Sequence, residues 1–186
     1  MDHTTIFGGF GGQGILFAGH VLAQAAVLED LAVTWMPSYG PEMRGGTASC
    51  TIVIADHPIG SPVVDTADSV IALNPPSLAR FEPFLASGGL VVVNTSLVEA
   101  TPRRTDVTVV AVPCSALARE SGDDRFVSIV GLGALIAARP TVRRASVEAA
   151  LAVVLGDRAS AWIDANLAAL DRGFEAGRPT ASALRA

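Results

Sequence analysis

The sequence predicts a single α/β domain, with a mostly parallel sheet, helices on both of its faces and a helical C-terminal third. In the first two-thirds of the chain, short apolar runs typical of strands buried on both faces alternate with helix-periodic segments. The last third contains helix-periodic segments alone. A length of 186 residues fits one domain of ordinary size with a substantial core.

The individual elements follow from hydrophobic periodicity and from the turn residues between segments. Strands are expected at residues 5–7, 32–36, 47–55, 69–73, 90–93 and 107–112. Helices are expected at residues 15–28, 77–85, 115–120, 126–138, 146–155 and 159–175. No repeat or linker interrupts this series. We therefore expect one domain over residues 1–177 and a flexible tail over residues 178–186.

The composition limits the classes of function. The chain is 50% hydrophobic and only 17% charged, yet no apolar run reaches the roughly 18 residues of a membrane span. This pattern favours apolar surface that is buried against other subunits. A net charge of −5 and a pI near 5.1 argue against nucleic-acid binding. The N-terminus has no basic region of a signal peptide, and a cytoplasmic location is expected.

Metal-binding and catalytic patterns are weak. Cys50 and Cys114 are expected to be buried free thiols, because no Cys-x-x-Cys occurs. His3, His20 and His57 are scattered and have no metal-ligand spacing. The sequence contains no lysine, no Gly-x-Ser-x-Gly elbow and no carboxylate–histidine–nucleophile set. We expect no catalytic residue in this chain, which has the character of a binding or docking domain.

A glycine-rich loop lies between the first strand and the first helix. It reads Gly9, Phe10, Gly11, Gly12, Gln13, Gly14. A Gly-x-Gly-x-x-Gly run in this position of a Rossmann-like domain is typical of a dinucleotide site. Such a site also needs an acidic residue at the end of the second strand, where this chain has Trp35, Met36 and Pro37. The loop therefore either binds another anionic group or lies against the backbone of another chain.

A second loop, residues 38–46, is expected at the same edge of the sheet, since it leaves the second strand. Its candidate binding residues are Tyr39, Met43, Arg44, Gly45 and Gly46. Arg44 could pair with a phosphate or a carboxylate, while Tyr39 and Met43 offer apolar contact. The alternative for Arg44 is a solvated side chain or one paired with Glu42.

The two loops, in this order and at this spacing, resemble the gamma subunit of 2-oxoacid:ferredoxin oxidoreductases, and the resemblance covers about residues 5–177. Further matches are Gly60-Ser61-Pro62, Ala72-Leu73-Asn74, Gly131-Leu132-Gly133-Ala134 and Asn166 with Ala168-Ala169. One departure is Ser128, where the family pattern is expected to have asparagine.

The resemblance implies a subunit of a complex that oxidatively decarboxylates a 2-oxoacid, forms acyl-coenzyme A and reduces ferredoxin. Its partners would be alpha and beta subunits, with a ferredoxin-like delta subunit as a possible addition. Coenzyme A is the ligand expected at the two loops, while thiamine diphosphate, Mg²⁺ and iron–sulfur clusters belong to partner subunits. The choice among pyruvate, 2-oxoglutarate and branched-chain 2-oxoacids stays open, with a lean to 2-oxoglutarate. The rival interpretations are a free-standing Rossmann-type dehydrogenase and a purely structural scaffold subunit.

Overall fold

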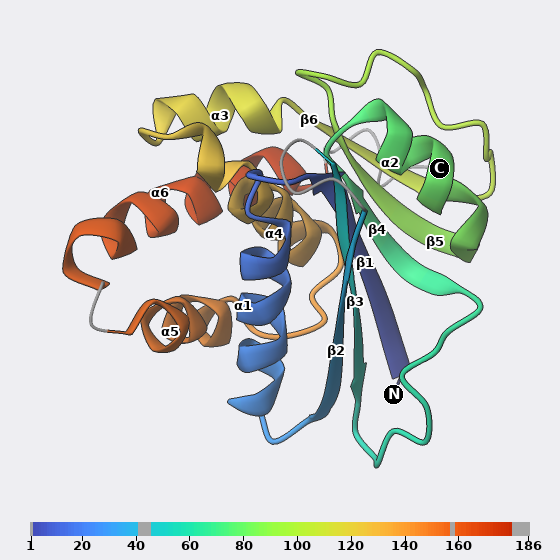
Figure 1. The fold of residues 1–186 in the computed structure, drawn as a ribbon, viewed down its shortest axis with the longest axis horizontal. Coiled ribbons are helices and arrows are strands. Elements are labelled where there is room, and N and C mark those ends of the chain that lie inside the picture. Colours follow the sequence, from blue (N-terminus) through green and yellow to red (C-terminus); the bar gives the residue numbers. More distant parts are fainter. Residues whose placement is uncertain (1, 41–45, 157–158, 180–186) are drawn as a thin grey trace.

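The computed structural model describes residues 2–40, 46–156 and 159–179 (Figure 1). It has an α/β fold with one six-stranded sheet in the order β2-β3-β1-β4-β5-β6. The strands are β1 (Asp2–Phe10), β2 (Ala32–Tyr39), β3 (Thr47–Ala55), β4 (Ala67–Ala72), β5 (Leu85–Asn94) and β6 (Thr108–Val112). The helices are α1 (Ile15–Val27), α2 (Pro75–Phe81), α3 (Cys114–Glu120), α4 (Val127–Ala138), α5 (Arg144–Leu155) and α6 (Ala159–Gly177). The predicted class is confirmed.

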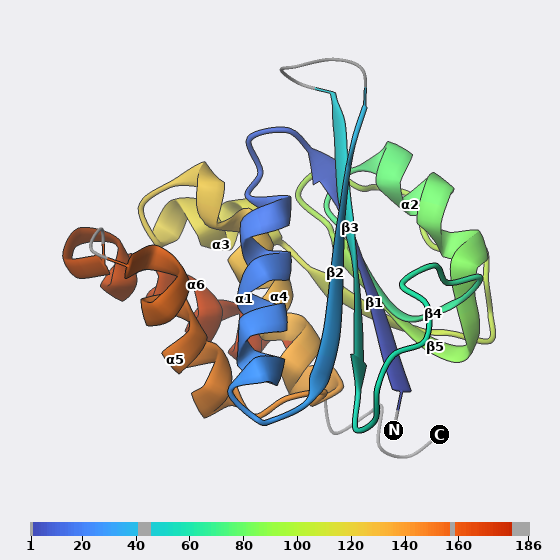
Figure 2. The same ribbon diagram turned by 60° about the horizontal axis from the view of Figure 1, so that its bottom comes forward.

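Strand direction differs from a fully parallel sheet at one strand. Strands β1, β4, β5 and β6 pair in parallel, whereas β3 is antiparallel to both of its neighbours, β1 and β2. Strands β2 and β1 therefore run in the same direction and end at the same edge. In Figure 2, β2 and β3 extend side by side past the start of α1. This edge of the sheet also carries the glycine-rich loop.

The two faces of the sheet are covered unequally, as Figure 1 shows. Helices α1, α4, α5 and α6 lie on one face, and α2 lies on the other. Side chains of successive residues alternate between two apolar clusters, as expected for strands buried on both sides. Val91 packs in the cluster of α2, for example, while Val92 packs in the larger cluster of the other helices. Helices on both faces were predicted correctly.

Helix α4 is buried on all sides between the sheet and α6, as its continuously apolar sequence predicted. Glycines let α4 and α6 approach closely. A Cβ on Gly133 would lie 2.2 Å from the backbone oxygen of Leu170, and one on Gly173 would lie 2.0 Å from that of Val130. The C-terminal helices are therefore fixed firmly against the sheet.

Several predicted boundaries were wrong. Strand β2 does not stop at Pro37 but continues to Tyr39, because an edge strand tolerates a residue without an N–H group. The helix predicted to reach residue 85 ends at Phe81, and a 3₁₀ turn, Glu82–Phe84, leads into β5. The helix predicted at residues 146–155 begins two residues earlier, at Arg144. From residue 180 onward, the predicted tail lies outside the described residues.

Candidate functional site

The glycine-rich loop turns the chain from β1 into α1. Gly9 and Phe10 end β1, and the side-chain oxygen of Gln13 accepts a hydrogen bond of 2.7 Å from the backbone N–H of Phe10. Gln13 thus joins the two ends of the turn by a hydrogen bond to Phe10. Gly14 caps α1 with a left-handed backbone, φ 73°, and no described side chain caps the first turn of this helix. The N–H groups of that turn and the positive end of the helix dipole remain available to an anionic group.

The two predicted loops meet. The backbone N–H of Gly11 donates a hydrogen bond of 2.9 Å to the backbone oxygen of Gly46, which directly precedes β3. On the other arm of the hairpin, the N–H of Gly40 donates to the oxygen of Thr47 at 2.8 Å. The predicted adjacency is therefore confirmed. Of the other residues assigned to this loop, Met43, Arg44 and Gly45 lie outside the described residues.

A cavity of about 560 Å³ opens beside the glycine-rich loop. Phe10, Gly11, Gly12 and Gly14 line it from the loop, together with Ile15, Leu16 and Phe17 of α1. Tyr39, at the end of β2, and Ala48 of β3 line it from the hairpin. Predicted loop residues thus contribute one wall of the cavity, and Tyr39, 72% exposed, stands at its rim.

The remaining wall comes from the C-terminal helices, which the sequence did not predict at this site. It contains Arg125 and Phe126, just before α4, and Leu155, Trp162 and Asn166 of α5 and α6. The rings of Phe126 and Trp162 meet edge to face at 5.9 Å between centroids. The spacing of Trp162 and Asn166, four residues apart, predicts that they share one helix face, but not which part of the chain that face contacts. The sequence predicts only a helix at residues 159–175 here, and Asn166 is a candidate through the family resemblance alone.

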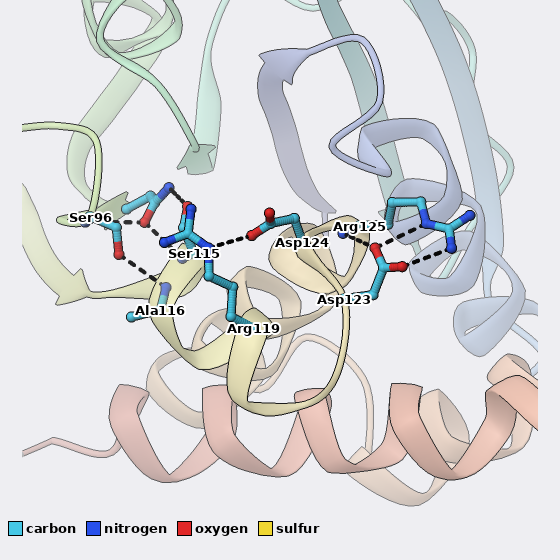
Figure 3. Close-up of polar contacts among 8 residues, drawn as sticks. Ser96, Ser115, Ala116, Arg119, Asp123, Asp124 and Arg125 are labelled. Carbon is cyan, nitrogen blue, oxygen red and sulfur yellow. Dashed lines mark hydrogen bonds and ion pairs between the residues drawn. The ribbon is translucent and has the colours of Figure 1, made fainter.

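Charges near the cavity are already paired. Arg125 donates to Asp123 at 2.7 and 3.0 Å, and its guanidinium lies 4.6 Å from the Trp162 ring centroid. The hydrogen bonds from Arg125 lower the pKa of Asp123 to about 2. Arg119 donates to Asp124 at 2.8 Å, as Figure 3 also shows. Among the described residues of this region, the uncapped start of α1 is therefore the clearest source of uncompensated positive potential.

The sequence matches the family described as "Pyruvate ferredoxin/flavodoxin oxidoreductase" over residues 4–176. The chain belongs to this family. Within it, the chain is 35% identical over 173 residues to the 2-oxoglutarate synthase subunit KorC of Methanocaldococcus jannaschii, covering 91% of each. It is 42% identical over 129 residues to the ketoisovalerate oxidoreductase subunit VorA of Methanothermobacter marburgensis. That match covers 69% of this chain and only 27% of the relative, so the chain corresponds to a fraction of VorA's length.

Solved structures agree with the family membership. The gamma subunit of a keto/oxoacid ferredoxin oxidoreductase from Geobacter sulfurreducens has a TM-score of 0.81 and 28% identity, covering 94% of this chain and 98% of that one. A 2-oxoglutarate:ferredoxin oxidoreductase from Magnetococcus marinus, solved with 2-oxoglutarate, coenzyme A and succinyl-CoA bound, has a TM-score of 0.85. It is 23% identical and matches over 31% of its length, so this second likeness concerns the fold alone.

The thiols of this family member are structural. Cys50 lies in β3 and Cys114 begins α3; both are free and buried, as predicted. Burial raises the pKa of each thiol to about 12. Neither is suited to act as a thiolate ligand. Within the described ranges, no group of three or more metal-ligating side chains occurs, and no helix is long and apolar enough to cross a membrane.

Proposed function

We propose that this chain is the gamma-type subunit of a multi-subunit 2-oxoacid:ferredoxin oxidoreductase in the cytoplasm. The complex would oxidatively decarboxylate a 2-oxoacid, transfer the acyl group to coenzyme A and reduce ferredoxin. Alpha and beta subunits would be the partners, with a ferredoxin-like delta subunit as a further candidate. The chain would not be catalytic alone. Family membership and the match to KorC over 91% of both chains support this assignment. Relatives named for 2-oxoglutarate and for ketoisovalerate both match, so assays should include both acids.

Within such a complex, the chain would dock on its partners and hold coenzyme A at the edge formed by the two loops. The observation that supports this role is the hydrogen bond between Gly11 and Gly46, which joins the glycine-rich loop to the hairpin beside the uncapped start of α1. Phosphates suit such a helix N-terminus. Arg44 of the hairpin would add a charge-assisted contact.

The other cofactors would belong to partner subunits. Thiamine diphosphate is held through a divalent cation, which needs oxygen ligands, and iron–sulfur clusters need several thiolates. The described residues offer two separate buried thiols and no ligand cluster, so they do not fit these groups. A dehydrogenase is also disfavoured, since β2 reaches Tyr39 without an acidic residue for a ribose.

The test is a calorimetric titration of coenzyme A into the assembled complex, with wild-type chain and with Arg44→Ala. Loss of a charged contact to a phosphate is expected to raise the Kd about 10- to 100-fold. Arg80→Ala is the matched control, because Arg80 lies on α2, on the opposite face of the sheet. Equal affinities for wild type and Arg44→Ala would remove the proposed role of Arg44.

A purely structural scaffold is the second candidate, and one observation favours it. Gly14 is required by the packing of the chain itself, because a Cβ there would lie 2.9 Å from the backbone oxygen of Arg125, and a Cβ on Gly9 would displace the side chain of Gln13, which would lie 2.6 Å away. Hydrogen exchange of the complex separates the two roles. Coenzyme A is expected to slow exchange of the amides at the start of α1, whereas a scaffold would show no such protection.

A further inference from the structure

Strand β2 lies at one edge of the sheet, and no strand of the described residues pairs with its outer side. The N–H of Gly40 donates to the oxygen of Thr47, which shows which residues of the hairpin bond inward. Because bonded and non-bonded pairs alternate along an antiparallel ladder, the even-numbered residues of β2 bond to β3. The N–H and C=O groups of Val33, Trp35 and Tyr39 therefore point away from the sheet. None of these groups has a backbone partner elsewhere in the described chain.

This edge lacks most of the features that protect an exposed strand from pairing. Residues 32–39 contain no charged side chain, and no bulge interrupts their pairing with β3. Pro37 occupies an outward-pointing position, so it removes a single N–H donor from the edge and leaves its C=O group as an acceptor. A neutral, regular strand of eight residues is therefore able to pair with another strand.

Exposed apolar side chains lie along the same edge. Trp35 is 38% exposed and stacks on His20 of α1, with 5.3 Å between the ring centroids. Val27 lies seven residues beyond His20, on the same face of α1, and is 49% exposed. Met36 is 40% exposed and points to the opposite face of the sheet. Together with Tyr39, these side chains form an apolar border that a partner would cover.

The sequence of β2 is complementary to itself in one antiparallel register. When Met36 lies opposite Met36 of a second copy, Val33 lies opposite Tyr39, and Trp35 lies opposite Pro37. Every outward N–H group then has a C=O group opposite it, and Trp35 donates to the carbonyl of Pro37. An aromatic residue opposite a β-branched residue is a favourable cross-strand pair.

Both faces of the sheet leave room for this pairing. Helix α1 packs on β3 and on both neighbours of β3 (Figure 2). In the second copy it would pack on the equivalent strand, three strand spacings or about 14 Å away. Since a helix with its side chains is about 10–12 Å wide, the two helices fit side by side, and His20, Val27 and Trp35 would fill the groove between them. On the other face, α2 packs on β1 and β4, away from the β2 edge.

We propose that two copies of this chain pair through β2, antiparallel about a two-fold axis at Met36, so that one sheet continues through both copies. A second copy fits because each residue pair is supplied by the same strand twice, as a two-fold interface requires. The neutrality of β2 permits this arrangement, since it brings no like charges opposite each other. The inference goes beyond the proposed function and does not depend on coenzyme A. A complex that contains this chain would contain it in pairs.

Cysteine cross-linking tests both the contact and its register. Met36→Cys places two thiols across the axis, in a non-bonded pair whose Cα atoms lie about 4.5 Å apart, and mild oxidation of the full-length chain should give a disulfide-linked dimer. Ser38→Cys is the matched control on the same face of β2. Its counterpart would lie about 13 Å away, too far for a disulfide. Cys50 and Cys114 are buried, so they should not contribute cross-links.

Sedimentation velocity of the full-length chain measures the pairing without a cross-link. The wild type is expected to be a dimer. Met36→Lys brings two ammonium groups opposite each other and should raise the dimer Kd about 10-fold or more. Val63→Lys, in the exposed segment after β3, should leave it unchanged. Both positions are exposed, so neither lysine is expected to unfold the chain.

Three results would overturn the proposal. They are a monomeric wild type, equal cross-linking of Met36→Cys and Ser38→Cys, and absence of the Met36→Cys cross-link in the assembled complex. The last result would mean that another subunit covers β2. None of them bears on coenzyme A binding, which the titration of the Arg44→Ala complex tests separately.

Discussion

Two glycines of the same loop are expected to respond differently to the same substitution. Gly12 and Gly14 both have positive φ angles, 97° and 73°, so alanine strains the backbone at either position. A Cβ on Gly12 would meet no atom of the described residues within 4 Å. On Gly14 it would lie 2.7 Å from the hydroxyl oxygen of Ser128 and 2.9 Å from the backbone oxygen of Arg125. Gly12→Ala is therefore an internal control for the clash at Gly14.

The expected magnitudes follow from these contacts. An alanine in a left-handed conformation costs about 1–2 kcal/mol, which is the whole effect expected for Gly12→Ala. Overpacking against a backbone atom adds about 1–3 kcal/mol, so Gly14→Ala should lose about 2–5 kcal/mol of unfolding free energy. The Ser128 side chain can rotate away, whereas the carbonyl of Arg125 can move only with the turn that precedes α4.

Urea unfolding of the purified chain measures the difference, and coenzyme A titration of the complex adds a second measurement. Gly14→Ala should lower the unfolding midpoint more than Gly12→Ala, with similar slopes. Gly12→Ala should nevertheless weaken coenzyme A binding, since its methyl group would occupy space that no described residue fills. Equal loss of stability in the two variants would refute the packing assigned to Gly14. Unchanged coenzyme A affinity in Gly12→Ala would contradict ligand approach at that residue.

Three further predictions concern the scaffold, and urea unfolding checks each. Gly173→Ala should lower the free energy of unfolding by about 1–3 kcal/mol, because the clash with Val130 outweighs the better helix propensity of alanine. A variant as stable as the wild type would contradict the close contact of α4 and α6. Burial lowers the pKa of His3, with Asp68 opposing and Arg139 adding to the shift, so the unfolded chain binds the extra proton and stability should fall as pH drops below about 6.5. In the His3→Gln variant, the free energy of unfolding should depend less on pH in this range. An unchanged pH dependence would contradict the role assigned to His3. Asn94→Ala should lower the free energy of unfolding by about 2–5 kcal/mol, because it leaves several buried hydrogen-bonding groups unpaired. Asn94→Asp should lower it by less than Asn94→Ala does. A loss under about 1 kcal/mol for Asn94→Ala would contradict the importance of the hydrogen bonds of Asn94.

Much of the fold could be predicted because its signals are local. Apolar runs and helical periodicity identified the strands and most of the helices, since burial on both faces of the sheet leaves a continuous apolar pattern. The direction of β3, which is antiparallel to its neighbours, was harder to predict from the sequence. The segment between Tyr39 and Thr47 is too short for a parallel crossover, and this length was the available signal for the antiparallel hairpin of β2 and β3. The end of β2 was predicted too early because Pro37 was taken as a strand terminator, whereas an edge strand tolerates proline.

The candidate site could be predicted only on the side built from neighbouring segments. The two loops were expected to meet because β1 and β2 end at one edge, and the bond from Gly11 to Gly46 confirms their adjacency. The opposite wall depends on contacts between residues far apart in the chain. Nothing in the local pattern around Trp162 or Asn166 indicates that α6 passes the start of α1. Helical periodicity predicted that Trp162 lies on the packing face of its helix, but not what it would face, and Asn166 was identified only through the family resemblance.

The residues of the glycine-rich loop have different roles, which follow from what each of them contacts. Gly14 must be small because the backbone of Arg125 packs against it, while the side chain of Gln13 folds back over Gly9 and accepts a hydrogen bond from Phe10. A Cβ on Gly12 would contact no atom of the described residues, so Gly12 is the position at which we expect a ligand to approach the loop. Because Arg125 beside the cavity is paired with Asp123, recognition of an anion by the described residues would depend on backbone N–H groups at the start of α1. The glycine-rich loop therefore packs tightly at Gly14 and still leaves the N-terminus of α1 without a side-chain cap from the described residues.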